Sequence, residues 1–235
     1  MLNNINLNKK VIITIASALG ELNSEVMYVG GAVVSLYIND PSAEDVRPTK
    51  DLDISMEIAS AGELEKIRKS LLSKGFRQST DDNVICRFRY EDIKVDVMGT
   101  KAIGWAPANP WFAPGFTKKE TVLIEDHRIQ ILPLPYFLAS KFEAFNNRGA
   151  RDPRTSHDFE DIVYVFDNCI DIVERLLDAE EDVKPFLKEQ FYDILNNRIK
   201  QEAIYGNLSY ETRDERYKKI MNCINKLHQS FKGPG

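Results

Sequence analysis

Two stretches of the chain alternate between polar and apolar side chains, and this alternation most constrains the fold. Residues 51–56 read Asp-Leu-Asp-Ile-Ser-Met, and residues 93–98 read Ile-Lys-Val-Asp-Val-Met. Successive side chains of a β-strand point to opposite faces, so Asp51 and Asp53 share one face while their apolar neighbours share the other. Asp96 lies opposite the valines of the second strand in the same way. If the two strands pair, Asp96 completes a cluster of three carboxylates with Asp51 and Asp53.

The three carboxylates predict a divalent metal site. A strand-edge Asp-x-Asp taken alone is more often a pair of solvated acids. Two acids on one face repel each other, however, unless a cation lies between them, and Mg²⁺ prefers carboxylate oxygens. Three such groups can hold two ions about 3.5–4 Å apart, which suits in-line phosphoryl or nucleotidyl transfer. We therefore expect Asp51, Asp53 and Asp96 to bind Mg²⁺ (or Mn²⁺) and to be catalytic.

A glycine pair, Gly30-Gly31, falls between an apolar strand at residues 26–29 and a helix expected at residues 32–39. Backbone N–H groups and the helix N-terminus at such a junction can bind phosphates. An isolated glycine pair is more often only a tight turn. The order of strand, glycine pair, helix, loop, Asp-x-Asp and later Asp96 is much more specific than any one of its parts.

The secondary-structure pattern changes near Pro133, because strand and helix signals mix before it and only helical periodicity follows it. We predict an α/β (α+β) chain with a mixed β-sheet domain at residues 1–132 and a helical C-terminal domain at residues 133–235. The expected strands are 26–29, 51–58, 84–90, 93–98, 121–125 and 128–132. The expected helices are 8–22, 32–39, 61–74, 135–147, 156–167, 169–178, 183–197 and 211–230. Between the strands, residues 101–119 are expected to form a long structured loop.

Composition and charge exclude several classes of protein. The net charge of −5 argues against a surface that coats nucleic acid broadly, though not against a local basic patch. The three cysteines are widely spaced, so neither a disulfide framework nor a structural zinc site is expected. The apolar run at residues 11–20 is too short to span a bilayer, and we expect a cytoplasmic protein with no membrane partner.

The glycine pair and the three acids resemble the motif of the polymerase-beta-like nucleotidyltransferase superfamily. The stretch Arg47-Pro48-Thr49-Lys50-Asp51-Leu52-Asp53 is similar, more narrowly, to the first motif of the AbiEii/AbiGii toxin-like family. In the second half, a helical lysine, a downstream arginine and an Asp-x-x-Asp pair match that family's later motifs. The residues placed on these later motifs are Lys141, Arg148, Asp152, Asp158 and Asp161.

This resemblance implies a nucleotidyltransferase fold and Mg²⁺-dependent transfer of a nucleoside monophosphate from an NTP, with pyrophosphate released. Its catalytic and metal-binding residues would be Asp51, Asp53 and Asp96. The nucleotide-binding residues that it implies are Gly30, Gly31, Thr49, Lys50, Lys141 and Arg148. Asp158 and Asp161 lie three apart and share a helix face, so they are further candidates, with a structural role as the alternative. The resemblance also implies the toxin of a toxin–antitoxin or phage-defence pair, with an antitoxin protein as partner.

The acceptor of the nucleotide is a separate hypothesis, and we favour RNA, in particular a tRNA end. Arg148, Arg151 and Arg154 could meet a backbone phosphate, and Trp105 and Trp111 could stack on an unpaired base. Alternatively, the arginines pair with acids and the tryptophans anchor a loop to the core. Alternative acceptors in the same reaction are a small molecule, as for antibiotic-modifying enzymes, and a protein. The remaining alternative is a nucleotide-binding protein without turnover, and the intact acid triad argues against it.

Overall fold

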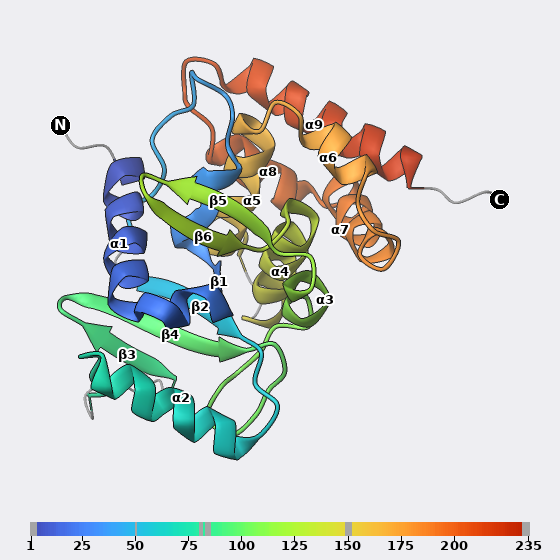
Figure 1. The fold of residues 1–235 in the computed structure, drawn as a ribbon. Helices are drawn as coiled ribbons and strands as arrows, with labels where there is room; N and C mark the ends of the chain where they lie inside the picture. The colour runs from blue at the N-terminus through green and yellow to red at the C-terminus, as the bar shows by residue number, and fades with distance from the viewer. Residues whose placement is uncertain (1–3, 50, 80–81, 83–85, 149–151, 232–235) are drawn as a thin grey trace. The chain divides into compact units, whose positions relative to one another are not determined.

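The computed structural model describes residues 4–49, 51–79, 82, 86–148 and 152–231 (Figure 1). It divides into two compact units. The first comprises Met1–Leu36 and Glu44–Pro133, and the second comprises Tyr37–Ala43 and Leu134–Gly235. Residues 37–43, which precede the predicted boundary by about ninety positions, thus belong to the second unit.

Among the described residues, six strands of the first unit form one mixed sheet in the order β3-β4-β2-β1-β6-β5. β2 pairs in parallel with β4, and β1 pairs in parallel with β6, whereas the other neighbours are antiparallel. The strands are β1 (Val26–Val29), β2 (Asp51–Met56), β3 (Arg87–Tyr90), β4 (Ile93–Gly99), β5 (Glu120–Ile124) and β6 (His127–Ile131). The mixed sheet expected from the sequence is therefore confirmed.

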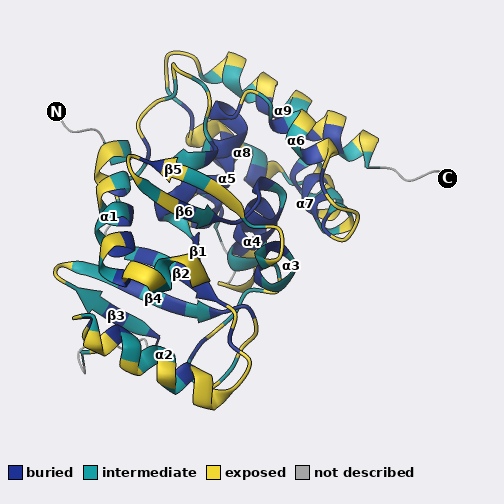
Figure 2. Cartoon of the chain, in the orientation of Figure 1, coloured by how far each residue is buried: buried dark blue, intermediate teal, exposed yellow. Residues whose placement is uncertain are grey.

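The sheet is most deeply buried at its centre. All four residues of β1 are buried, because β2 and β6 flank this strand (Figure 2). β4 instead alternates, with Val95 and Val97 fully buried and Asp96 only half-buried. The apolar face of β2 and β4 therefore contributes to the core, and the opposite face leaves its aspartates accessible.

Helices of the first unit follow local signals in the sequence. α2 begins after Ser60, whose Oγ accepts a hydrogen bond from the Glu63 backbone N–H at 3.2 Å, and it ends before Gly75, which has a φ of +91°. The helix expected at residues 32–39 is a short 3₁₀ helix. The expectation of a loop throughout residues 101–119 is wrong, because a short helix, α3, lies within it. The helices are α1 (Asn4–Leu19), η1 (Gly20–Glu25), η2 (Gly31–Tyr37), α2 (Ala61–Ser73) and α3 (Phe112–Phe116).

From Leu134 onward, the described part of the second unit contains helices joined by loops and no strand, as expected. Phe142 and Phe166 meet Phe191 edge-on, with ring centroids 6.3 and 5.7 Å away, and all three rings are fully buried. No described helix is both long enough and apolar enough to cross a membrane. The helices are α4 (Leu134–Asn147), α5 (His157–Asn168), α6 (Ile172–Leu177), α7 (Lys184–Asn196), α8 (Arg198–Gly206) and α9 (Arg213–Ser230).

One helix of this unit, α8, was missing from the expectation. Asn197 separates it from α7: the Asn197 Oδ1 accepts hydrogen bonds from the backbone N–H groups of Ile199 and Lys200 at 3.1 and 3.3 Å. An asparagine that caps the next helix must leave the helical conformation itself. The expected helix at residues 183–197 therefore ends one residue earlier, and a new helix starts at once.

Residues 37–43 are held to the helical unit by packing and hydrogen bonds. The Tyr37 ring lies 4.4 Å from that of Phe137. The Asn39 Oδ1 accepts from the Ile170 backbone N–H at 2.7 Å, and the Asp40 N–H donates to the Asn168 carbonyl at 3.2 Å. These contacts explain why a segment so early in the sequence belongs to the C-terminal unit.

Candidate active site

The sheet register places two of the predicted acids side by side. Asp53 on β2 pairs with Asp96 on β4, and Asp96 in turn pairs with Arg87 on β3. Residues that face each other across neighbouring strands point to the same side of a sheet. Asp51, two residues before Asp53, shares this face and pairs with Lys94. The face therefore combines three carboxylates with three cationic side chains, those of Arg87, Lys94 and, farther along β3, Arg89.

Gly30 makes room for the Asp53 carboxylate. Its φ of +75° is a conformation that side-chain-bearing residues rarely adopt, and a Cβ built there would lie 1.9 Å from the Asp53 Oδ2. Val29, the residue before it, is the pairing partner of Asp53 across β1 and β2. The glycine pair is thus more than a tight turn, because the backbone at Gly30 closes against an acid of the site.

The charges of the site are partly balanced within the protein. The Arg87 guanidinium binds Asp96 through two parallel hydrogen bonds, with Nε 2.7 Å from Oδ1 and Nη2 2.7 Å from Oδ2. Both side chains are 17% exposed. The hydrogen bond to Asp96 is the main reason why the pKa of Arg87 is raised above its usual value. Asp51, at 48% exposure, has weaker partners, with Lys94 Nζ at 3.7 Å and Arg87 Nη2 at 4.0 Å.

The sequence analysis missed Arg87 and Lys94, although the sequence contained a signal for them. The two-residue turn Glu91-Asp92 sets the hairpin register, which places position 87 opposite position 96. Glu91 adopts the left-handed φ of +51° that such a turn needs. The expectation that a metal ion balances the acids therefore omitted two cations of the chain itself.

The carboxylates of this face are the type of ligand that Mg²⁺ prefers, but in the structure the three groups do not converge on one point. Carboxylate oxygens are the ligands that Mg²⁺ takes from proteins, and Asp51 and Asp53 are carried by one strand face. Within the described part of the chain, no three His, Cys, Asp or Glu side chains lie close enough together to hold a metal ion. Asp96 is turned to Arg87 instead. A site of three acids would thus include a carboxylate that is already paired with a cation of the chain.

The cysteine next to the acids is not an activated nucleophile. Cys86 is the neighbour of Arg87, and burial, followed by the charge of Asp96, raises the pKa of its thiol to about 11. A thiol with such a pKa is protonated at neutral pH and is a weak nucleophile. Cys86 therefore gives no support to covalent catalysis at this face.

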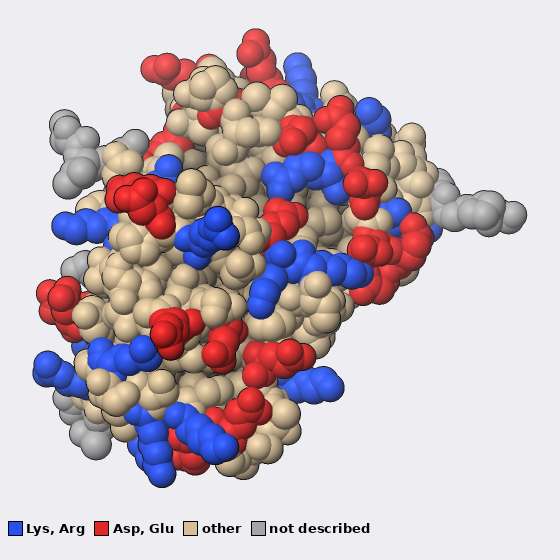
Figure 3. Space-filling view, in the orientation of Figure 1, with Lys and Arg blue, Asp and Glu red and all other residues tan. Residues whose placement is uncertain are grey.

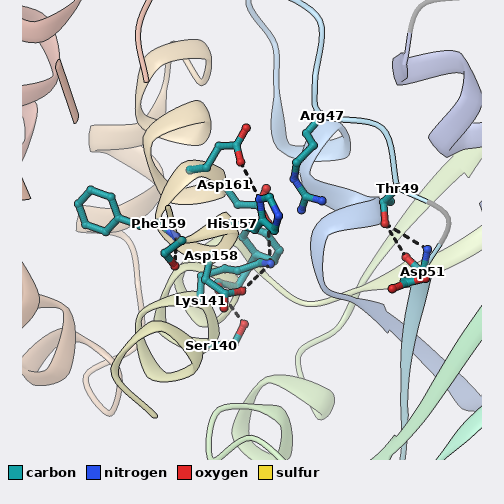
Figure 4. Close-up of polar contacts among 12 residues, drawn as sticks. Arg47, Thr49, Asp51, Ser140, Lys141, His157, Asp158, Phe159 and Asp161 are labelled. Carbon is teal, nitrogen blue, oxygen red and sulfur yellow. Dashed lines mark hydrogen bonds and ion pairs between the residues drawn. The ribbon is translucent and has the colours of Figure 1, made fainter. Parts of the chain in front are cut away.

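The loop before β2 is fixed by the first helix. The Asn8 side chain, fully buried in α1, accepts from the Thr49 backbone N–H at 3.1 Å and donates to the Arg47 carbonyl at 3.2 Å. The Thr49 hydroxyl donates to the Asp51 carbonyl at 3.0 Å and accepts from the Asp51 N–H at 3.2 Å (Figure 4). Thr49 therefore shapes the start of the strand that carries the acids. Lys50 lies outside the described residues.

Asn8 was another residue that sequence reasoning missed. It belongs to the buried stripe of α1, at helical spacing before Ile12, Ile15 and Leu19. A polar amide in such a stripe requires a hydrogen-bond partner, which was the available signal. Asp45 anchors the same loop, since its carboxylate accepts from the backbone N–H groups of Asn4 and Ile5 at 2.6 and 3.1 Å.

The second unit gathers the predicted residues Lys141, Arg148, Asp158 and Asp161 on α4 and α5. The Lys141 ammonium lies 2.6 Å from the Asp161 carboxylate and 3.2 Å from that of Asp158 (Figure 4). These three side chains are at most 9% exposed, whereas Arg148, which reaches Asp158 at 3.2 Å, is 78% exposed. The two acids hold the Lys141 helix, which was the structural alternative considered for them. The ammonium expected to face a triphosphate is engaged inside the helical unit.

Two of the residues considered for RNA binding, Arg154 and Trp105, have partners within the protein. Arg154 forms two hydrogen bonds to the Asp152 carboxylate, at 2.8 and 3.1 Å, and Arg151 lies outside the described residues. The Trp105 indole N–H donates to Glu65 at 3.1 Å, and its ring lies 5.8 Å from that of Phe88. Trp105 therefore anchors its loop to the core, in line with the alternative reading of the sequence.

Replacing Lys141 by Met is expected to lower the free energy of unfolding by about 3 kcal/mol. The substitution leaves Asp158 and Asp161 as buried carboxylates without their shared cation, which is strongly destabilising. Urea denaturation followed by far-UV circular dichroism measures this loss. Arg154→Gln, which removes an exposed cation from a carboxylate, is the control and should leave the midpoint nearly unchanged. An unchanged midpoint for Lys141→Met would show that this cluster is not structural.

A mixed sheet presents Asp51, Asp53 and Asp96 on one face, and a glycine turn is fitted against Asp53, which is the arrangement expected from the resemblance to nucleotidyltransferases. The family model described as "Nucleotidyl transferase AbiEii toxin, Type IV TA system" matches residues 29–222. The chain therefore belongs to this family of nucleotidyltransferase toxins of type IV toxin–antitoxin systems. The family resemblance drawn from the first-motif residues is thus confirmed.

Three solved structures are similar to the chain. An antigenic nucleotidyltransferase-like protein from Paracoccidioides brasiliensis has 17% sequence identity and a TM-score of 0.48, over 89% of this chain and 97% of that chain. The antibiotic-resistance factor ANT(2'')-Ia has 15% identity and a TM-score of 0.47, over 80% and 95%. JHP933 from Helicobacter pylori has 12% identity and a TM-score of 0.45, over 96% and 92%. No curated protein matches the chain.

Proposed function

We propose that this chain binds an NTP together with Mg²⁺ (or Mn²⁺) and transfers the nucleoside monophosphate to RNA, with a tRNA end as the favoured acceptor. Family membership supports the reaction class. The observation that carries the proposal is the row of acids on β2 and β4, with Gly30 closed against Asp53. Such a row serves the metal-assisted, in-line displacement of pyrophosphate.

Each residue has a proposed task in this reaction. Asp51 and Asp53 would hold the metal ion, and Asp96 would join them and help to activate the acceptor hydroxyl. A bound Mg²⁺ would stabilise charge on the phosphoryl group as a Lewis acid. The backbone at Gly30 and Gly31, at the start of η2, would let the phosphates approach closely.

For the other residues that the resemblance implies, binding of the nucleotide remains a prediction. Thr49 and Lys50 precede the acids on the chain and would help to shape the phosphate site. Arg148 keeps most of its guanidinium exposed and is therefore available to a phosphate. Lys141 would contact a nucleotide only after it leaves Asp158 and Asp161. We propose that its main role is structural: it holds α5 and the carboxylate of Asp158, to which Arg148 binds.

An exposed group of tyrosines and an arginine on the helical unit supports an RNA acceptor. Arg213 lies 5.1 Å from the Tyr205 ring and 5.5 Å from the Tyr210 ring, and Tyr210 is 85% exposed. Exposed aromatic rings beside a cation can stack unpaired bases. Lys and Arg are interspersed with Asp and Glu on the face drawn in Figure 3, so binding of a polyanion should be weak and salt-dependent.

The acceptor is tested by incubating the protein with Mg²⁺, an NTP labelled at the α-phosphate and a cell lysate. We expect a labelled band that disappears after RNase treatment and persists after proteinase treatment. Tyr210→Ala should weaken this labelling without changing NTP binding. Tyr192→Ala, which removes another exposed tyrosine of the same unit, is the matched control.

Other outcomes of this experiment identify the other acceptors. Label that stays in protein bands after RNase treatment would contradict the RNA proposal and favour a protein acceptor. Label confined to small molecules would favour an antibiotic-type enzyme. Binding of the NTP with no labelled product in any fraction would favour a nucleotide-binding protein without turnover. Suppression of labelling by a protein encoded beside this chain would identify the proposed antitoxin.

A further inference from the structure

Arg87 lies beside the acids, and the proposed function gives this arginine no role. Arg87 uses both Nε and Nη2 to bind both oxygens of Asp96, at 2.7 Å each. Its Nη2 also lies 4.0 Å from the Asp51 carboxylate on the far side of β4. One guanidinium thus faces two of the three acids to which metal binding is assigned.

This pair is built into the sheet and is not a chance surface contact. Arg87 and Asp96 are direct partners in the β3–β4 hairpin. The next residue of β3, Phe88, has its ring fully buried on the opposite face of the sheet, and this fixes the face on which Arg87 lies. At 17% exposure for each side chain, solvent screens the pair only partly. A planar guanidinium that binds a carboxylate through two hydrogen bonds is the strong form of this interaction.

We propose that Arg87 is a resident counter-cation of Asp96, and that it must leave this carboxylate before a divalent cation can bind there. The ion pair would thereby set the metal affinity of the site and hold the acids together while no metal is bound. Two cations at the same carboxylate repel each other strongly when solvent screens them only partly. This inference rests on the proposed function, since it concerns the same three acids.

Binding of Mn²⁺, followed by electron paramagnetic resonance of the free ion, tests the proposal without requiring activity. Arg87→Met should bind Mn²⁺ about tenfold more tightly than the wild type, since it removes a charge-assisted competitor from Asp96. The double variant Arg87→Met with Asp96→Asn should lose this gain, because the carboxylate that the metal would enter is gone.

Arg89→Met is the matched control. Arg89 lies two residues along the same strand, on the same face, and its guanidinium binds Asp82 through two hydrogen bonds at 2.7 and 2.8 Å. The Mn²⁺ affinity of this variant should equal that of the wild type. Should Arg87→Met fail to fold, as judged by circular dichroism, Arg87→Lys keeps a cation without the planar fork and should show a smaller gain.

The results separate this inference from the function on which it rests. Wild-type binding of Mn²⁺ with equal or weaker binding by the folded Arg87 variant would overturn the counter-cation role and leave the proposed function standing. Equal gains in the Arg87 and Arg89 variants would assign the effect to general surface charge and also overturn it. Failure of every variant and of the wild type to bind Mn²⁺ would contradict the metal-dependent function itself.

Discussion

Replacing Asp53 by Asn is expected to reduce nucleotide transfer by about a thousandfold or more. The substitution keeps the shape of the side chain but removes the charge that would hold the metal ion at the centre of the acid row. The rate of label transfer from an α-labelled NTP measures the loss. Asp51→Asn should have an effect of similar size, because Asp51 lies on the same face of β2.

The fold of the Asp53 variant should survive, because removing one member of a group of like charges relieves repulsion. Thermal unfolding is the check. Asp126→Asn, in the exposed turn between β5 and β6, removes a carboxylate of the same unit outside the row and should leave transfer unchanged. Near-native transfer by the Asp53 variant would show that the site has been assigned to the wrong residues.

Gly30→Ala is expected to abolish transfer as fully as removal of Asp53. The new Cβ would lie 1.9 Å from the Asp53 Oδ2, so the carboxylate must move away from its place on the sheet. An alanine at a φ of +75° also carries a backbone strain of about 1–2 kcal/mol. Transfer rate and unfolding midpoint should be measured together, because backbone strain lowers the midpoint whereas displacement of Asp53 lowers the transfer rate.

Gly20→Ala separates these two effects. Gly20 has a φ of +58°, and the nearest atom to its added Cβ is the end of the flexible Lys74 side chain at 3.5 Å. It should therefore show the strain alone, with a lower midpoint and normal transfer. Equal transfer rates for Gly30→Ala and Gly20→Ala would mean that the close approach of Gly30 to Asp53 has no catalytic importance.

Local patterns predicted much of the fold. The alternation in residues 51–56 and 93–98 predicted two strands with their acids on one side, and the structure pairs them as β2 and β4. The helix expected at residues 61–74 is α2, which begins after the capping residue Ser60 and ends just before Gly75. These features depend on residues that are neighbours in the sequence, so they can be predicted without knowledge of the tertiary structure.

Features that depend on distant contacts could not be predicted in the same way. The binding of residues 37–43 to the helical unit rests on Tyr37 and Asn39, which find their partners more than ninety positions away. The burial of Lys141 between Asp158 and Asp161 depends on how α4 and α5 pack, whereas the family resemblance had implied that this lysine binds the nucleotide. Arg87 is an intermediate case, because the hairpin register would have placed it opposite Asp96.

The most direct test of the central claim compares the fate of two labels of one NTP. A nucleotidyltransferase breaks the bond between the α- and β-phosphates, so the acceptor should carry label from the α-phosphate and none from the γ-phosphate. We predict α-label in the acceptor in the presence of Mg²⁺, γ-label in released pyrophosphate, and neither reaction in the Asp53→Asn variant. Transfer of the γ-label to the acceptor, or α-labelling that persists in that variant, would contradict the account.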